Sequence, residues 1–380
     1  DFQTSWIQIA FYGSYFCLAL PAAIFTTKFS YKVGVLVGLG MYIVGALMFF
    51  PASQTMNYFH FLAALYVLAG GLSFLETAAN PYVIAMGPEE TGTRRLNLAQ
   101  SFNPLGSISG VLISKFFILS SLNQASSEDR AAMSADALQA VQQEELSAVM
   151  GPYVGLAIFL FVIWVAILVI RMPKASDDEI PPLSESCGFL RGQPSYVWGG
   201  ISPFVYVGAP ICVWSYTIRY VMAEVGLNES AASTYYLGSL ILFVASRFVC
   251  TALMQFIPPS RLLFALAVLA IALSVGTMFA SGYTGVFCLV GISGCMSLMF
   301  PTIFGLSVHG LGKHTKIGGS GQIMAILGGA VITAIQGQVS DATDIKIAFI
   351  VPAICFALIA YYALFEVSRG ERQSAPLQVA

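Results

Sequence analysis

Charged side chains are scarce in this sequence. Lys, Arg, Asp and Glu together make up 9% of its 380 residues, against roughly 25% in an ordinary soluble domain. The 17 basic and 19 acidic residues almost balance, and no basic cluster or face is present. The sequence therefore lacks the electrostatic footprint of a nucleic-acid-binding protein.

Metal-binding and catalytic motifs are also lacking. The seven cysteines form no CxxC pair and no metal-ligand spacing, and most lie inside apolar runs, where they act as small packing residues. There is no HExxH motif, no nucleophile grouped with a base, and no long segment that could form a soluble output domain. We therefore expect no metal and no cofactor, and we regard an enzyme or a sensor as the less favoured class.

Apolar residues, by contrast, are abundant. They make up 57% of the chain, and the mean hydropathy is +0.79. They fall in blocks of about 20 residues, the length that a helix needs to cross a hydrocarbon core about 30 Å thick. The sequence predicts an all-α membrane protein whose main partner is the lipid bilayer.

Polar, proline and glycine breaks divide the apolar residues into eleven predicted spans. They start near Trp6, Val33, Phe59, Leu96, Gly151, Val197, Ser233, Leu262, Gly285, Gly318 and Ile347. Alternating the loops places nearly all basic residues, and the C-terminus, on one side, which the positive-inside rule identifies as cytoplasmic. The acidic segment 121–150 lies on the other side, and its part 134–150 has the signals of a short surface helix, with a loop as the alternative.

Residue 1 then lies on the outer side, at the start of a descending helix, so we expect one further helix to precede residue 1. A polar segment, residues 172–196, separates five spans from six. The sequence predicts two six-helix bundles, residues 1–171 and 197–380, joined by this cytoplasmic linker.

An internal repeat supports two related halves. Residues 71–106 align with residues 291–328, with these matched pairs: Gly71 with Gly291, Pro81 with Pro301, Gln100 with Gln322, and Gly106 with Gly328. Transporters built from such repeats bind their substrate between the halves, near the bilayer midplane, and alternate access by moving one half against the other. Polar residues at mid-depth are therefore the candidates for a binding site.

Glu76 is the most informative of these residues. It stands within residues 59–86, an almost wholly apolar run, where an ionised carboxylate costs at least about 2.5 kcal/mol. A carboxyl group at such a depth can change protonation when its surroundings change, as a proton-coupling residue must. We interpret Glu76 as such a residue, with a buried structural acid as the alternative.

Amide side chains follow Glu76 along the chain. Asn97, Gln100 and Asn103 recur at three-residue steps and so share one helical face. Residue counting places Asn103 at a depth similar to that of Glu76, so that both could face one cavity. Amides and carboxylates suit sugar hydroxyls, whereas interhelical hydrogen bonding is the alternative for Asn97 and for Asn80, which also precedes a proline.

Four further candidates lie in the second half. Arg247 could oppose a carboxylate or bind the substrate, or it could extend to the inner membrane surface. Trp214 and Tyr216 could stack on a sugar, although membrane aromatics more often pack or anchor a helix. Gln322 is the repeat counterpart of Gln100.

The motifs around these residues resemble a known family. LETAANPYV at 75–83 and RLNLAQSFN at 95–103 are similar to the L-fucose:proton symporter family of the major facilitator superfamily, as are WSYTIRY at 214–220 and FPTIF at 300–304. The resemblance covers essentially the whole chain. It implies a twelve-helix bacterial inner-membrane symporter that imports L-fucose or a related sugar with a proton, and we expect it to function as a monomer.

The same resemblance implies roles for individual residues. It gives Glu76 a part in substrate binding and coupling, and Gln100 and Asn103 match sugar-site amides of the family. Related glucose and galactose transporters share the AANP and LNLAQ stretches but often lack the acid at position 76, which favours fucose. A uniporter or a sodium-coupled carrier for hexoses or amino sugars is the alternative.

Two departures from the family pattern stand out. The family carries another acidic residue on its first helix, and that helix would precede residue 1 of this sequence. The superfamily also has a Gly-x-x-x-Asp-Arg pattern in the inner loop after the first span of this chain. Here Ala23, Thr27 and Lys28 stand in place of its Gly, Asp and Arg.

Overall fold

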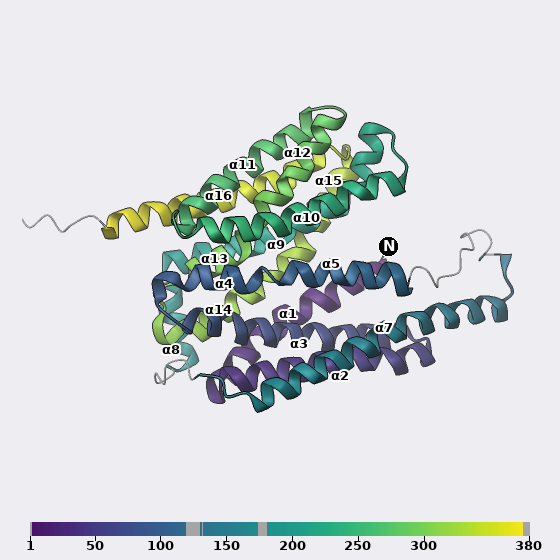
Figure 1. The fold of residues 1–380 in the computed structure, drawn as a ribbon, viewed down its shortest axis with the longest axis horizontal. Helices are drawn as coiled ribbons and strands as arrows, with labels where there is room; N and C mark the ends of the chain where they lie inside the picture. The colour runs from purple at the N-terminus through teal and green to yellow at the C-terminus, as the bar shows by residue number, and fades with distance from the viewer. Residues whose placement is uncertain (1, 119–129, 131, 174–180, 375–380) are drawn as a thin grey trace, which may run out of the picture. The chain divides into compact units, whose positions relative to one another are not determined.

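The computed structural model describes residues 2–118, 130, 132–173 and 181–374, and all regular structure within them is helical (Figure 1). The first part of the chain forms α1 (Phe2–Lys28), α2 (Tyr31–Thr55), α3 (Tyr58–Ala85), η1 (Glu89–Thr91), α4 (Gly92–Gln100), α5 (Asn103–Ile113), η2 (Ser114–Ile118) and α7 (Ala135–Val169). The second part begins with α8 (Leu183–Arg191), α9 (Pro194–Val225), α10 (Glu229–Leu253), α11 (Pro259–Phe279), α12 (Tyr283–Met296) and α13 (Met299–Val308). It continues with η4 (Gly312–His314), α14 (Thr315–Met324), η5 (Ala325–Leu327), α15 (Gly328–Ala342), η6 (Ile347–Phe349) and α16 (Ile350–Ser374).

Ten helical segments of the described chain are long and apolar enough to cross a membrane. They agree with ten of the eleven predicted spans and confirm an all-α membrane fold. The exception is the span predicted from near Leu96, where two shorter helices, α4 and α5, are separated by Ser101 and Phe102. The break has a local cause, because Pro104 has no N–H to donate to the carbonyl of Gln100 four residues earlier.

Helix α7 differs from the prediction. A short helix over residues 134–150, or a loop, was expected before a separate span from Gly151. Instead α7 runs unbroken over 35 residues with Pro152 inside it, and the Ser134 side chain caps it by accepting a hydrogen bond from the Ala137 amide at 3.3 Å. The prediction of separate elements was wrong because a proline is tolerated inside a long membrane helix. Most of the preceding outer loop lies outside the described residues.

Contacts divide the chain into two compact units. The first comprises residues 1–79 and 105–173, and the second comprises residues 80–104 and 174–380. The predicted bundle boundaries at residues 171 and 197 stay a prediction.

The first unit is held together by close helix contacts. A Cβ atom at Gly38 of α2 would lie 2.8 Å from the Leu75 amide nitrogen of α3, so only glycine allows this approach. Helix α7 packs on α2, where Trp164 Nε1 donates to the Leu36 carbonyl at 2.9 Å. Lys32 Nζ donates to the Leu168 and Ile170 carbonyls, each at 2.8 Å, and so satisfies the C-terminal end of α7.

The second unit has a large apolar core around α9. This helix packs against α10, α12, α13, α15 and α16. Its Gly208 faces Ile332 of α15, where a Cβ atom would clash. The largest fully buried side chains are mostly in this unit and include Tyr220, Phe304, Phe349, Phe356 and Tyr362.

The predicted linker contains a docked helix. Residues 174–180 lie outside the described residues, but α8 packs on α14 in the second unit. The ring of Phe189 stacks on His314 with centroids 4.2 Å apart, and His314 Nδ1 lies 3.1 Å from Ser186 Oγ. Lys313 and Glu185 form an exposed ion pair at 3.1 Å.

Segments related by the internal repeat pack reciprocally within the second unit. Helix α4 lies on α13, where a Cβ atom at Gly305 would lie 2.6 Å from Thr93 Oγ1. Its repeat counterpart α14 meets the end of α3, where a Cβ atom at Gly319 would lie 2.9 Å from Pro81 Cγ. This is the packing expected of two copies related by a pseudo-two-fold axis.

Candidate functional site

The Glu76 carboxyl group, on α3, receives a hydrogen bond from a neighbouring helix. Tyr15 of α1 is 4% exposed, and its Oη donates to Glu76 Oε1 at 3.2 Å. Two other bonds fix the α1–α3 contact: Ser14 Oγ donates to the Tyr66 carbonyl at 2.7 Å, and Ser73 Oγ donates to the Tyr15 carbonyl at 3.3 Å. Glu76 is thus held by a neutral group.

This partner suits a carboxyl group that changes protonation. Among the described residues, no cationic side chain forms an ion pair with Glu76 within 4.0 Å. A tyrosine hydroxyl donates to a carboxylate and can also accept from a protonated carboxyl group. The pair therefore accommodates both protonation states of Glu76.

Sequence reasoning missed Tyr15. Nothing in its local sequence distinguishes it from the other aromatic residues of α1, because its position depends on the pairing of α1 with α3. The nearest signal was Ser14, a small polar residue of the kind found where membrane helices contact one another, which bonds to the Tyr66 carbonyl of α3.

Three predicted amides form a hydrogen-bonded chain in the second unit. Asn103 Nδ2 donates to Gln100 Oε1 at 3.4 Å, and Gln100 Nε2 donates to Asn80 Oδ1 at 2.9 Å. Asn80 is buried, and its Nδ2 atom has no hydrogen-bond partner among the described residues. An unsatisfied buried donor costs about 1–3 kcal/mol, so a ligand oxygen that accepted from Asn80 would be favoured.

Asn80 and Glu76 both belong to α3. They are four residues apart along this continuous helix, so their side chains leave it on the same face. Glu76 and Asn80, the last residue of the amide chain, therefore follow one another along one face of α3.

Asn97 has a different environment from Gln100 and Asn103, with which it was predicted to share a helical face. It is fully buried, and its Nδ2 donates to Thr302 Oγ1 of α13 at 3.1 Å and to the Thr93 carbonyl at 2.9 Å. The bond to Thr302 is an interhelical tie of the kind that the sequence left open as the alternative to sugar binding, whereas the bond to Thr93 lies within α4.

Arg247 is buried on α10, with 5% exposure. Its Nη1 donates to the Gln100 carbonyl at 3.0 Å and its Nε donates to the Ser297 carbonyl. Its guanidinium carbon lies 4.7 Å from the centre of the Phe243 ring. No carboxylate oxygen of the described chain lies within ion-pair distance of it, so its contacts are with carbonyl dipoles and a ring.

The remaining candidates, Trp214, Tyr216 and Gln322, differ in whether other side chains already occupy them. Trp214 Nε1 donates to Ser293 Oγ at 3.1 Å, and the Arg219 guanidinium lies 5.5 Å from the centre of the Tyr216 ring. Gln322 is fully buried, and neither of its amide atoms has a hydrogen-bond partner among the described residues. Gln322 is therefore the candidate of this group with unused hydrogen-bonding capacity.

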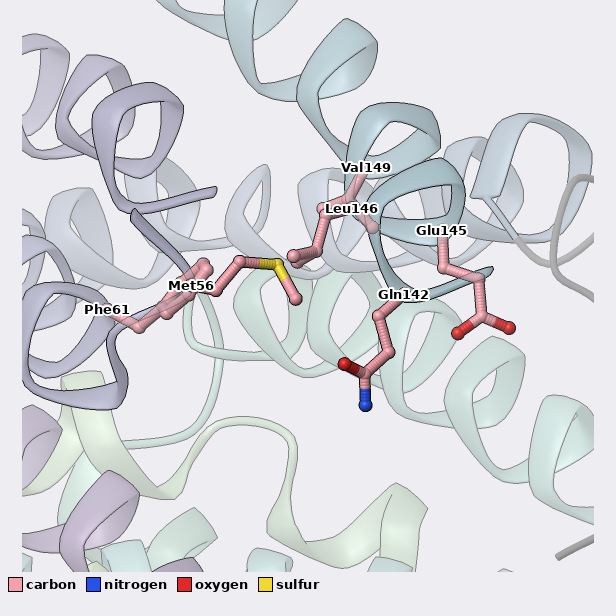
Figure 2. A pocket seen from close by; sticks show the side chains of 6 residues that line it. All are labelled: Met56, Phe61, Gln142, Glu145, Leu146 and Val149. Atoms are coloured by element: carbon pink, nitrogen blue, oxygen red, sulfur yellow. The ribbon is translucent and has the colours of Figure 1, made fainter. Parts of the chain in front are cut away.

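A cavity in the first unit lies away from the predicted side chains. It has a volume of about 290 Å³ and is lined by Met56, Phe61, Gln142, Glu145, Leu146 and Val149. Figure 2 shows Met56 and Leu146 pointing toward one another across it. Glu145 is already paired with Arg130, with 2.5 Å between Oε1 and Nη2. None of the predicted site residues lines this cavity.

Metal-ligating side chains do not gather in the described part of the chain. No group of three or more His, Cys, Asp or Glu residues there could hold a metal ion. The hydrogen-bonding groups of the candidate site are a carboxyl group, a phenol hydroxyl and amides, which bind hydroxylated ligands and protons.

Comparison with known proteins gives matches over nearly the whole chain. The family model described as Major Facilitator Superfamily matches residues 1–333. An L-fucose-proton symporter of Escherichia coli (strain K12) is 38% identical over 372 residues, which cover 96% of this chain and 85% of that protein. A glucose/galactose transporter of Brucella abortus biovar 1 (strain 9-941) is 36% identical over 368 residues, which cover 95% of this chain and 85% of that protein.

A solved structure is similarly close. The crystal structure of FucP, a Major Facilitator Superfamily transporter in the outward conformation, superimposes with a TM-score of 0.90 at 38% identity. The match covers 96% of this chain and 90% of that chain. The similarity thus extends well beyond the motifs around residues 75–103.

Proposed function

Because this chain belongs to the Major Facilitator Superfamily, we propose that it is a secondary active transporter that imports L-fucose, or a closely related monosaccharide, together with a proton. The E. coli relative named for this activity is 38% identical over almost the whole chain. The observation in the structure that supports the proposal most is the Glu76 carboxyl group, which has a tyrosine hydroxyl as its partner and, among the described residues, no cation within ion-pair distance. A carboxyl group without a fixed counter-ion can load and release a proton during a transport cycle.

The sugar site in this proposal is built from the amides and Glu76. Gln100, Asn103 and Asn80 supply donors and acceptors for sugar hydroxyls, and the Asn80 Nδ2, which forms a hydrogen bond with no described residue, supports this role. Asn97 holds α4 in place behind them. In the second half, Gln322, Trp214 and Tyr216 are the proposed contacts, and the Gln322 amide has no hydrogen-bond partner within the described part of the chain.

Coupling follows from joint binding at one site. A protonated Glu76 still accepts from a sugar hydroxyl through its carbonyl oxygen, so the proton and the sugar occupy the site in the same state. Alternating access then carries both across the bilayer. The proton is the coupling ion, and the protein needs no other cofactor and works as a monomer.

The proposed topology places the chain in a bacterial inner membrane with the C-terminus in the cytoplasm. It rests on the Lys and Arg residues that gather on one set of loops. Residues 1–171 and 197–380 form the two bundles, and residues 172–196 link them on the cytoplasmic side.

A hexose is the second candidate substrate. The Brucella relative, named for glucose and galactose, is 36% identical over the same extent, and amide side chains bind the hydroxyls of any monosaccharide. The carboxyl group at position 76 favours fucose over this alternative.

Uptake by proteoliposomes tests the proposal. When the outside is more acidic than the inside and sodium is absent, we expect labelled L-fucose to accumulate. A protonophore should abolish this accumulation. A panel of deoxyhexoses and hexoses as competitors identifies the preferred sugar. Accumulation that requires sodium and ignores the pH gradient would select a sodium-coupled carrier, and equilibration without accumulation would select a uniporter.

A further inference from the structure

Arg247 contacts two carbonyl groups that belong to different helix breaks. We propose that Arg247 is a positioning residue that pins the broken helix bearing Gln100 and Asn103 to the α12–α13 break. This inference rests on the proposed function, because it gives Arg247 a part in sugar binding without contact with the sugar.

The first carbonyl is that of Gln100, at the end of α4. In an unbroken helix it would accept the amide of residue 104, but Pro104 has no N–H. Arg247 Nη1 donates to this oxygen at 3.0 Å instead. The guanidinium therefore replaces a backbone donor that the sequence removes.

The second carbonyl is that of Ser297, which lies between α12 and α13. Its helical donor would be the amide of residue 301, which is again a proline. Arg247 Nε donates to the Ser297 oxygen. One side chain thus satisfies two carbonyls, each four residues before a proline, in segments that come from the two halves of the repeat.

Arginine is suited to this bridge. Its planar group carries five N–H donors in fixed directions and stays charged when buried, whereas a lysine ammonium is a compact point charge. The Phe243 ring, 4.7 Å from the guanidinium carbon, adds a cation–π contact. Two carbonyl dipoles and a ring therefore stabilise a buried charge that has no carboxylate partner in the described chain.

The bridge fixes the backbone at the start of the amide chain. The Gln100 carbonyl accepts from Arg247. In the Gln100 side chain, Nε2 donates to Asn80 Oδ1 at 2.9 Å and Oε1 accepts from Asn103 Nδ2 at 3.4 Å. Because the carbonyl belongs to the residue at the break, loss of the bridge lets the Gln100 side chain leave the position that Asn80 and Asn103 require. Sugar affinity then falls although no group that touches the sugar has been removed.

The first test is sugar binding by variants of Arg247. We expect Arg247→Met to raise the dissociation constant of L-fucose about tenfold, equivalent to about 1.4 kcal/mol. Arg247→Lys should behave like Arg247→Met because one ammonium cannot reproduce the two-armed contact. Arg261→Met, which removes an exposed arginine paired with Glu371 at 3.1 Å, is the matched control and should change affinity less than twofold.

The second test restores the missing backbone donors. Pro104→Ala and Pro301→Ala each supply an N–H to a carbonyl that Arg247 serves. In that double-alanine background, Arg247→Met should raise the dissociation constant of L-fucose less than threefold, because the two carbonyls then have backbone donors. In a Pro51→Ala background, with an exposed proline of α2 replaced, the full tenfold loss should remain. Equal losses in all three backgrounds would overturn the proposal.

Amide hydrogen exchange separates this inference from the proposed function, since it needs no sugar. Arg247→Met should speed exchange at least tenfold in peptides covering residues 98–103 and 297–302, and the two Pro→Ala changes should reverse the effect. If wild-type protein binds no monosaccharide but shows this exchange pattern, the transport proposal fails and the bridge stands. If wild-type protein binds L-fucose and exchange in these peptides is unchanged by Arg247→Met, the bridge is wrong and the transport proposal stands.

Discussion

The Tyr15 hydroxyl donates a hydrogen bond to the Glu76 carboxyl group across 3.2 Å, from α1 to α3. The two residues are 61 positions apart, and two serine–carbonyl bonds also join their helices. The contact gives the carboxyl group a defined orientation without a counter-charge. It is the feature on which the proposed proton coupling depends.

Removal of the tyrosine hydroxyl should impair coupling more than folding. A hydrogen bond to a charged group contributes about 1.5–3 kcal/mol, so we expect Tyr15→Phe to reduce proton-driven fucose uptake at least tenfold and to displace its pH profile. Tyr12→Phe, one helical turn earlier in α1, is the matched control and should leave the profile in place. An unaltered profile in Tyr15→Phe would show that the bond has no part in coupling.

The amide chain should act as a unit in sugar binding. We expect Gln100→Ala and Asn80→Ala each to raise the half-saturation concentration for fucose about tenfold, and the double variant to lose little more, because the two side chains share one hydrogen bond. Gln142→Ala, at the cavity of the first unit, should have no effect. Fully additive losses at positions 80 and 100 would contradict a connected chain.

Asn97 should matter for stability and not for sugar recognition. Loss of its buried bond to Thr302 leaves a buried polar group unsatisfied, at about 1–3 kcal/mol. We expect Asn97→Ala and Thr302→Val to lower the thermal unfolding midpoint by several degrees, while the half-saturation concentration stays within twofold of wild type. A loss of affinity without loss of stability in Asn97→Ala would instead place this amide in the sugar site.

The contact of α4 with α13 should tolerate no side chain at Gly305. A Cβ atom there would lie 2.9 Å from the Thr93 backbone Cα, so Gly305→Ala must push the two helices apart at a cost of about 1–3 kcal/mol. We expect a lower unfolding midpoint and slower uptake. Gly110→Ala in α5, where no atom lies within 4 Å of the added carbon, should be neutral, and an equally stable Gly305→Ala would refute the tight contact.

Much of this architecture could be predicted from hydropathy and glycine, proline and charge patterns. The ten spans follow from local hydropathy, and the internal repeat of residues 71–106 and 291–328 marked the segments that pack reciprocally. The break between α4 and α5 was missed because Pro104 acts on a carbonyl four residues earlier, inside a run that is otherwise continuous. The unbroken course of α7 was missed because Gly151-Pro152 is a strong break signal in water and a weak one in a membrane helix.

The partners of the polar side chains could not be predicted in the same way. Tyr15 meets Glu76 and Arg247 meets the Gln100 carbonyl only after distant helices pack. Sequence reasoning expected a carboxylate or the substrate opposite Arg247, since charge complementarity is the usual partner rule. That rule does not consider carbonyls that lack a backbone donor because a proline stands four residues later. Pro104 and Pro301 nevertheless identify these carbonyls in the sequence.

The central claim, that Glu76 couples sugar entry to proton entry, is tested most directly by comparing net uptake with exchange. In proteoliposomes, Glu76→Gln should abolish fucose accumulation driven by a pH gradient and remove the proton uptake that accompanies added fucose. It should still exchange labelled for unlabelled fucose when both sides contain the sugar, because exchange needs no net proton movement. A Glu76→Gln protein that still accumulates fucose with wild-type pH dependence and proton uptake would contradict the account.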